Sequence, residues 1–311
     1  MTDYRNDSNN IIQQIDQQHG KDLNAIFGDW KESLHYMIVA GSRMYGTHTD
    51  NSDYDIYGFA TPLSIYFNPY QEGLIPEFDE VPIFRNFRAE VVINDKPSEV
   101  VIYSLPRFVG LAYENNPNII ETLFCRPENV IHVDYIGYYF RFLNNGFLRQ
   151  KFVHKSQKFA ESQLNKIKNR SPIGSRKELI EKYGYDTKHA YHVLRAYIQA
   201  SDAMETRTLR IGHNLDFVRA VKFGEVSFED FIQQVEYYQS KVEHRENTDP
   251  LPVEGRVQHI RETLRNSLVL ARKDLAPMIL EDYWVERPEI HHVGECMRYI
   301  FESAEEFRSG E

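Results

Sequence analysis

Residues 36–46 of this 311-residue chain read Tyr36-Met37-Ile38-Val39-Ala40-Gly41-Ser42-Arg43-Met44-Tyr45-Gly46, and this stretch decides the fold. Its first five residues form a short apolar run, which is typical of a buried strand. Gly41 and Ser42 then break the run and open a turn whose backbone N–H groups can face an anion. The stretch therefore predicts a strand that ends in a phosphate-binding turn.

A pair of carboxylates follows this turn after a short polar connector. Asp53 and Asp55 lie two residues apart in a second predicted strand that runs to Pro62, so both side chains point to the same face. Two adjacent carboxylates repel each other, and each loses solvation on burial, unless a cation lies between them. Oxygen ligands suit Mg²⁺ or Mn²⁺, and the pair therefore predicts a metal site.

The Gly-Ser turn followed by Asp-x-Asp resembles the nucleotidyltransferase superfamily typified by DNA polymerase β. Within it, the chain is similar to the YcgL-type predicted nucleotidyltransferases of bacteria and phages. Three later segments carry that similarity: Tyr103-Ser104-Leu105-Pro106-Arg107-Phe108, Asn116-Pro117-Asn118 with Glu121, and Gly184-Tyr185-Asp186-Thr187-Lys188-His189-Ala190-Tyr191-His192. The resemblance implies Mg²⁺-dependent transfer of a nucleoside monophosphate from an NTP to an acceptor hydroxyl, with release of pyrophosphate.

The same resemblance implies a third carboxylate on a neighbouring strand. Glu99 stands where similar proteins usually carry Asp ahead of the Tyr103 segment, so we predict Asp53, Asp55 and Glu99 as the catalytic metal ligands. Asp95 is the alternative, although its place in an Asn-Asp-Lys-Pro turn favours backbone capping. Asn118 and Glu121 are expected near the site, and capping of a helix explains Asn118 equally well.

Several residues are predicted to bind the nucleotide. Gly41 allows close approach of the backbone to phosphates, and Ser42 adds a hydroxyl donor. Arg43 either reaches a phosphate or pairs with an acidic neighbour such as Asp50. On a later predicted helix, Lys188, His192 and Arg195 lie at i, i+4 and i+7 and share a face suited to a triphosphate. A core position is the alternative for His192.

The fold class expected from these patterns is α+β. A small mixed sheet with flanking helices should form a nucleotidyltransferase domain at 1–135, and a helical domain should follow at 136–311. Helices are expected within 1–30 and from Ser104 to near Asn115, further strands at 91–93 and 100–103, and an irregular excursion at 63–90. Later helices are expected at 136–145, 154–169, 175–200, 215–222, 227–243 and 254–273.

Charge is unevenly distributed along the chain. The net charge is -10, which discourages general adhesion to nucleic acid. Residues 151–195, however, hold eleven Lys and Arg against four Asp and Glu, which gives this window +7 and the remainder -17. Such asymmetry favours an RNA acceptor, particularly a tRNA end, on the basic window. A solvated helix surface is the simpler explanation of the window.

Other readings of the sequence remain open. A protein hydroxyl modified by AMP needs no basic surface, and a small-molecule acceptor is also allowed. A non-catalytic nucleotide sensor, or an interaction scaffold using Tyr283, Trp284, Tyr299 and Phe301, belongs to a different class. Cys125 and Cys296 match neither a metal site nor a disulfide framework, and no run approaches the ~18 apolar residues of a membrane span. We therefore expect a cytoplasmic protein without membrane contact.

Overall fold

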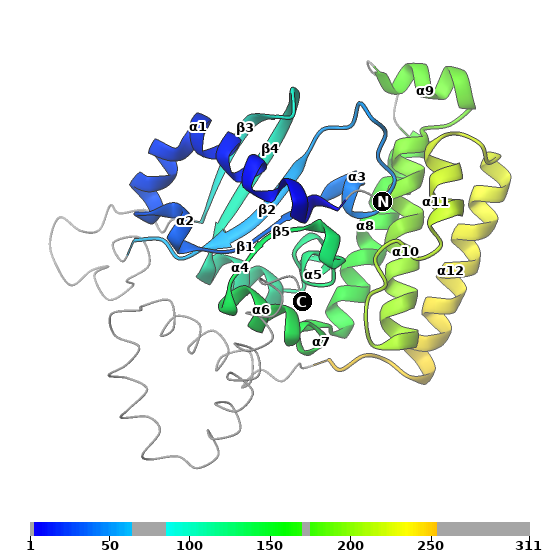
Figure 1. Cartoon of the computed structure of the whole chain (residues 1–311). Coiled ribbons are helices and arrows are strands. Elements are labelled where there is room, and N and C mark those ends of the chain that lie inside the picture. The colour runs from blue at the N-terminus through cyan, green and yellow to red at the C-terminus, as the bar shows by residue number, and fades with distance from the viewer. Residues whose placement is uncertain (1–2, 64–84, 170–174, 254–311) are drawn as a thin grey trace, which may run out of the picture.

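The protein is built on a mixed β-sheet with helices on both faces (Figure 1). The computed structural model describes residues 3–63, 85–169 and 175–253. Within these ranges the strands are β1 (Leu34–Val39), β2 (Asp55–Ala60), β3 (Asn86–Ile93), β4 (Lys96–Ser104) and β5 (Val130–Val133). Their order across the sheet is β3-β4-β2-β1-β5, with β2 and β4 parallel and the other neighbours antiparallel. This confirms the α+β class.

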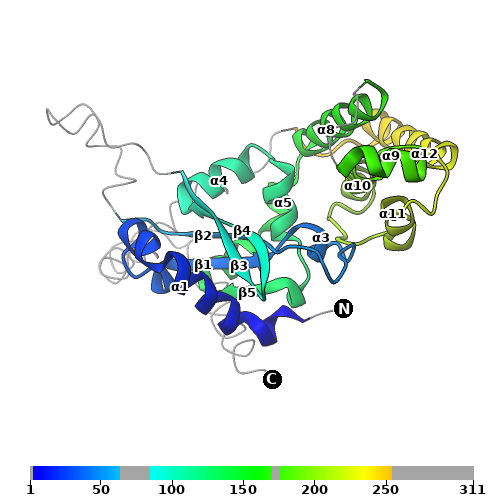
Figure 2. The same cartoon turned by 90° about the horizontal axis from the view of Figure 1, so that it is seen from above.

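Helices cover both faces of the sheet and form a bundle beside it (Figures 1 and 2). The helices of the first part are η1 (Tyr4–Asp7), α1 (Ser8–Phe27), α2 (Trp30–Ser33), α3 (Gly41–Met44), α4 (Leu105–Tyr113), α5 (Pro117–Leu123) and η4 (Pro127–Asn129). Those that follow are α6 (Tyr135–Phe142), α7 (Asn144–Phe147), α8 (Gln150–Asn169), α9 (Ser175–Tyr183), α10 (Thr187–Thr206), α11 (Leu215–Lys222) and α12 (Phe228–Thr248). The bundle consists of α8, α10, α11 and α12.

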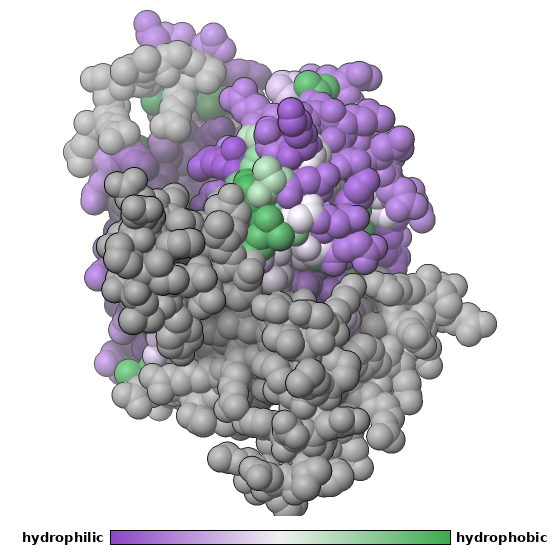
Figure 3. Space-filling view, turned by 90° about the vertical axis from the view of Figure 1, so that its left-hand side faces the viewer, coloured by the Kyte–Doolittle hydropathy of each residue, from purple (hydrophilic) through white to green (hydrophobic). Residues whose placement is uncertain are grey.

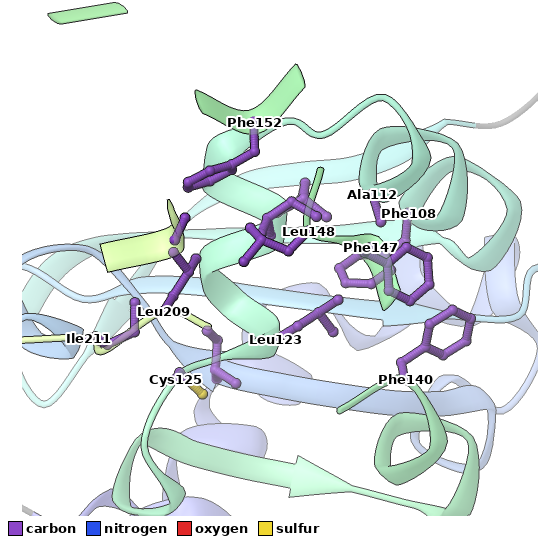
Figure 4. Close-up of a cluster of buried hydrophobic side chains, with 14 of the residues drawn as sticks. Phe108, Ala112, Leu123, Cys125, Phe140, Phe147, Leu148, Phe152, Leu209 and Ile211 are labelled. Carbon is purple, nitrogen blue, oxygen red and sulfur yellow. The ribbon is translucent and has the colours of Figure 1, made fainter. Parts of the chain in front are cut away.

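The two faces of the sheet bury separate sets of apolar side chains. One set, which includes Met37 and Ile56, packs under α1, while alternate residues such as Ile38 and Phe59 point to the other face. On that second face Phe59 packs against Phe108 of α4, with ring centroids 4.3 Å apart. The cluster continues through α5, α6, α7 and the end of α10 (Figure 4).

Most elements lie where the sequence predicts them. The Ser104 side chain caps α4 by accepting a hydrogen bond from the backbone N–H of Arg107, as the Leu-Pro that follows it indicates. Three elements differ from the prediction. Strand β3 begins at Asn86, inside the segment 63–90 that was expected to be irregular. The helix expected at 175–200 is broken at Gly184, whose φ of +83° ends α9, and Asp186 then caps α10. Strand β5 was not predicted, because its four residues give too short a pattern.

The boundary between 1–135 and 136–311 stays a prediction. The buried cluster on the α4 face contains side chains from both sides of it, among them Phe59 and Phe140. The helix expected at 254–273 and the aromatic residues of the C-terminal segment lie outside the described residues. No helix in the described part of the chain combines the length and apolarity needed to cross a membrane. On the side that carries α1 and α2, the described residues in view are mostly hydrophilic, with a small apolar patch (Figure 3).

Candidate active site

The sheet places two of the predicted carboxylates side by side. Asp55 opens β2, Glu99 lies in β4, and the two residues are paired directly across this parallel strand pair. Asp55 shares its sheet face with Phe59, so its carboxylate lies on the side covered by α4. Asp53 lies two residues before β2 rather than in the strand, where the sequence had predicted it, and it is exposed. Tyr54 between the two carboxylates is buried against the opposite face.

The charges of these three carboxylates influence one another. Burial raises the pKa of the Asp55 carboxyl, and the negative charges of Asp53 and Glu99 raise it further, while Lys188 and Arg43 act in the opposite direction. A raised carboxyl pKa means that the ionised form lacks compensation in the protein alone. Among the described residues, no three acidic, histidine or cysteine side chains are close enough to hold an ion by themselves. Carboxylate oxygens are the kind of ligand that a hard cation prefers.

Gly41 lies directly against Asp55. Its φ is +58°, and a Cβ at this position would overlap the Asp55 carboxylate and lie 2.7 Å from its Cγ. The backbone N–H of Ala40 also donates to the carbonyl of Asp55 at 2.7 Å. Only glycine combines this backbone conformation with such close approach. The Gly-Ser turn and the carboxylate pair, predicted from separate parts of the sequence, thus meet in one place.

Arg43 is 6% exposed, and its guanidinium is occupied within the protein. It donates from Nε to the carbonyl of Asp53 at 2.9 Å and from Nη2 to the carbonyl of Ser52 at 2.5 Å. Its plane also lies 3.9 Å from the centroid of the Tyr54 ring. Arg43 therefore holds the loop that carries Asp53, and these contacts match neither the phosphate nor the Asp50 pairing that the sequence left open.

Glu99 is held by an ion pair with the neighbouring edge strand. Arg88 of β3 donates to both carboxylate oxygens, from Nε at 2.7 Å and from Nη2 at 2.9 Å. The Arg88 side chain is 65% exposed, so the pair lies at the surface and exchanges easily with other partners. Asp95, the alternative third carboxylate, sits in the β3–β4 turn with a φ of +61°, as a turn residue should.

The helical part supplies cations to this end of the sheet. Lys188 of α10 is exposed and close enough to influence the charge of Asp55. Lys222 of α11 donates from Nζ to the carbonyl of Thr47 at 2.7 Å. Burial and the positive charge of Lys188 lower the pKa of Lys222 to about 8, although Asp53 and Asp55 counteract them. Arg219, one turn earlier on α11, contributes to the same field.

Lys222 and Arg219 were missed by the sequence analysis. Both lie far from Asp53 along the chain, and no motif spacing connects them to it. The available signal was weak, since two basic residues in the last turn of α11 also suit the negative end of a helix. His48, after the Gly-Ser turn, was missed as well. Burial and the charges of Arg43 and Lys222 lower the pKa of His48.

His192 and Arg195 are both half-buried on α10. Burial, together with the charges of Arg195 and Lys188, lowers the pKa of His192 to about 3, so the imidazole is neutral. The Arg195 guanidinium lies 4.3 Å from the centroid of the Tyr45 ring and beside the buried carboxylate of Glu121. Tyr45 in turn donates its hydroxyl proton to Glu121. Arg195 and Glu121 thus both contact Tyr45, which follows the Gly-Ser turn. Asn118 is exposed at the start of α5.

Comparison with known proteins gives one family. The family model described as RNA repair pathway DNA polymerase beta family (RlaP) matches residues 9–274, which is most of the chain. No curated protein matches it. Among solved structures, the chain is similar to a nucleotidyltransferase-like protein from Exiguobacterium sibiricum 255-15, with 10% sequence identity and a TM-score of 0.28 over 96% of this chain and 91% of that chain. A TM-score this low supports no conclusion.

The family match confirms the superfamily that Gly41-Ser42 and Asp53-Tyr54-Asp55 resemble, and the structure places Gly41 against Asp55. Both motifs therefore lie at the same end of the sheet. The chain therefore belongs to the RNA repair pathway DNA polymerase beta family and is a nucleotidyltransferase.

Proposed function

We propose that the protein transfers a nucleoside monophosphate from a Mg²⁺-bound NTP to an acceptor hydroxyl, an RNA or tRNA end being the favoured acceptor. The observation that carries this proposal is the opposition of charges at one end of the sheet. Asp55 pairs across the sheet with Glu99 and follows Asp53 by two residues. The charge of Lys188 on α10 acts on Asp55, and Lys222 on α11 interacts with Asp53 and Asp55. Carboxylates that lack a compensating cation thus lie near lysines that lack a compensating anion. This arrangement suits a metal-bound triphosphate.

The carboxylates and the Gly-Ser turn would have different binding roles. Asp53 and Asp55 would hold the metal, with Glu99 as the third ligand once it leaves Arg88. Two protein carboxylates are sufficient to bind Mg²⁺ where substrate phosphates complete the coordination shell of the metal. Bound Mg²⁺ would neutralise phosphate charge and lower the pKa of the attacking hydroxyl. The backbone of Gly41 and Ser42 would orient the phosphates by donating hydrogen bonds, since both residues are half-buried and open the short helix α3.

The helical part would bind the outer phosphates. Lys188 is exposed, and Lys222 is half-buried with its ammonium group at the Thr47 carbonyl that follows the turn. Positioning and charge neutralisation are the main tasks in phosphoryl transfer, so side chains fixed by such contacts contribute directly. His192 and Arg195 stay predicted contacts of the nucleotide.

The test is a label-transfer assay. The full chain is incubated with Mg²⁺, each of the four α-labelled NTPs in turn and total cellular RNA together with protein. Label in RNA, with release of pyrophosphate, is the expected result. Label in polypeptide would identify the alternative of protein nucleotidylation. Equilibrium binding of an NTP with no pyrophosphate release would identify a nucleotide sensor and contradict the proposed transfer.

Replacing Lys222 by methionine should weaken NTP binding and remove its pH dependence. In the wild type, Lys222 loses its proton as pH rises through about 8, so NTP affinity should fall above that value. The variant lacks this cation at every pH, and we expect a Kd for NTP raised roughly tenfold below pH 8, in line with a lost charge-assisted hydrogen bond. Titration of NTP binding on both sides of this pH measures the effect.

The matched control for this experiment is Lys31→Met. Lys31 of α2 forms an ion pair with Asp16 of α1, with the two charged atoms 2.6 Å apart. The pair lies away from the predicted metal ligands, so loss of Lys31 should leave NTP binding unchanged. A Lys222→Met variant that keeps the wild-type decline of affinity at alkaline pH would show that another group titrates there.

A further inference from the structure

One stripe of α8 carries basic and aromatic side chains at regular intervals. Lys151, Lys155 and Phe159 follow each other in steps of four residues, which places them on one face of the helix. Each step covers ~6 Å along the axis. The two lysines are half-buried, and Phe159 is 38% exposed despite its large apolar ring. Cations next to an exposed aromatic ring are the combination that binds single-stranded nucleic acid.

An arginine with unpaired side-chain nitrogen atoms immediately precedes α8, outside the stripe itself. Arg149 is 5% exposed, and its buried Nε and Nη2 atoms have no hydrogen-bond partner. Its guanidinium lies 4.6 Å from the centroid of the Tyr113 ring at the end of α4. Buried polar groups normally find a partner, and an unpaired guanidinium is costly. Arg149 therefore adds positive charge without a hydrogen-bond partner beside Tyr113 and Glu114.

Positive charge is in excess around Arg149. Lys151 forms an ion pair with Glu114 at 2.5 Å, and Lys155 lies 3.8 Å from the same carboxylate and donates to the Glu114 carbonyl. Three cations thus surround one carboxylate, which is itself 52% exposed. Burial and the neighbouring charge of Lys151 lower the pKa of Lys155, as expected where cations are crowded. A phosphate that replaced Glu114 would balance this charge more fully.

The stripe leads to the candidate active site. Helices α8 and α10 lie side by side (Figures 1 and 2), and Phe159 packs its ring edge-to-face on His192, with centroids 6.2 Å apart. Lys188, one turn before His192, is close enough for its charge to lower the pKa of Asp55. At the other end, Glu114 follows α4, which packs on the sheet face that carries Asp55. The stripe and the carboxylates therefore belong to the same side of the molecule.

We propose that this stripe of α8 binds the acceptor as a single RNA strand. Lys151 and Lys155 hold successive backbone phosphates, Arg149 adds positive charge beside them, and Phe159 stacks on a base close to the nucleotide that receives the new residue. The inference rests on the proposed function for the location of the chemistry. Binding of the strand itself, however, needs neither NTP nor metal, so the two proposals fail separately.

Equilibrium binding of a fluorescent single-stranded RNA of about ten nucleotides tests this proposal. Anisotropy is measured with the full chain over a range of salt concentrations, without NTP. For the double variant Lys151→Ala and Lys155→Ala, we expect affinity to fall at least tenfold and the slope of log K against log salt to lose ~1.4, or ~0.7 for each phosphate contact. For Phe159→Ala, we expect a loss of roughly tenfold with the slope unchanged, because stacking carries no charge.

The matched control is the double variant Lys21→Ala and Lys31→Ala. It removes the same charge from α1 and α2, on the side of the molecule shown in Figure 3, and should keep wild-type RNA affinity. NTP binding should be unchanged in all three variants, which shows that they are folded. RNA affinity and salt slope unaffected by loss of Lys151 and Lys155, or failure of the wild type to bind RNA, would overturn the proposal. Retained RNA binding in a protein without NTP turnover would count against the proposed function alone.

Discussion

Replacing Asp55 by asparagine is expected to lower the rate of nucleotidyl transfer on the order of 10³-fold, because metal-assisted charge neutralisation is worth several kcal/mol in such reactions. Asparagine keeps the shape of the side chain but removes the charge that would hold the metal. Single-turnover transfer from an α-labelled NTP measures the loss.

The same variant should unfold at a higher temperature than the wild type. Burial and the charges of Asp53 and Glu99 raise the pKa of the Asp55 carboxyl, so the ionised form destabilises the fold at neutral pH. The direction of this stability change follows from the linkage between proton binding and folding. The folded state holds this proton more tightly than the unfolded state, and stability is lost as pH rises through the carboxyl pKa. The neutral amide of the Asp55→Asn variant removes that cost above the carboxyl pKa.

Asp50→Asn is the control for both measurements, since Asp50 is exposed in the connector between the turn and β2. It should keep normal activity and thermal stability. Full transfer activity in Asp55→Asn would remove Asp55 from the metal site, whereas a fall in melting temperature would contradict the charge repulsion that we infer.

Replacing Gly41 by alanine is expected to reduce transfer by at least 10²-fold, the effect of a displacement of about 1 Å in an active site. The new Cβ would overlap the Asp55 carboxylate, and the φ of +58° disfavours any side chain. Either the turn or the carboxylate must move, and both are needed for the metal-bound substrate. Steady-state kinetics with saturating NTP would show the change mainly in kcat.

Gly184→Ala provides a control with the same backbone penalty. Gly184 has a φ of +83°, but a Cβ there would meet no heavy atom within 4 Å. Its alanine variant should lose ~1–2 kcal/mol of stability, the usual cost of a left-handed residue, and keep its activity. Equal losses of activity in the two variants would mean that backbone strain, and not contact with Asp55, explains the effect at Gly41.

The sequence predicted the sheet and its turn because local signals there agree with the tertiary structure. The apolar run before Gly41 and the alternation around Asp55 each describe a strand, and the Ser104 cap describes a helix start. The break at Gly184 was overlooked in the helix boundaries because the helical pattern continues on both sides of it. A single left-handed glycine decides between one helix and two.

The site was only partly predictable, because chain spacing does not report which helices pack together. Lys188 and Arg195 share a stripe of α10, yet one is exposed near Asp55 and the other lies over the Tyr45 ring. Packing of the turn against α10 causes this difference. Lys222 enters the site for the same reason, through its contact with the Thr47 carbonyl.

The buried cluster of Figure 4 also has a consequence for synthesis of the chain. The sheet face under α4 is completed by Phe140, Phe147 and Phe152, and further by Leu209 and Ile211 after α10. On the ribosome, this face stays open to water until the segment near Ile211 has emerged. The strands that carry the carboxylates are synthesised early, but the residues that cover this sheet face are synthesised late. A nascent chain halted in α10 would therefore expose an apolar surface to chaperones.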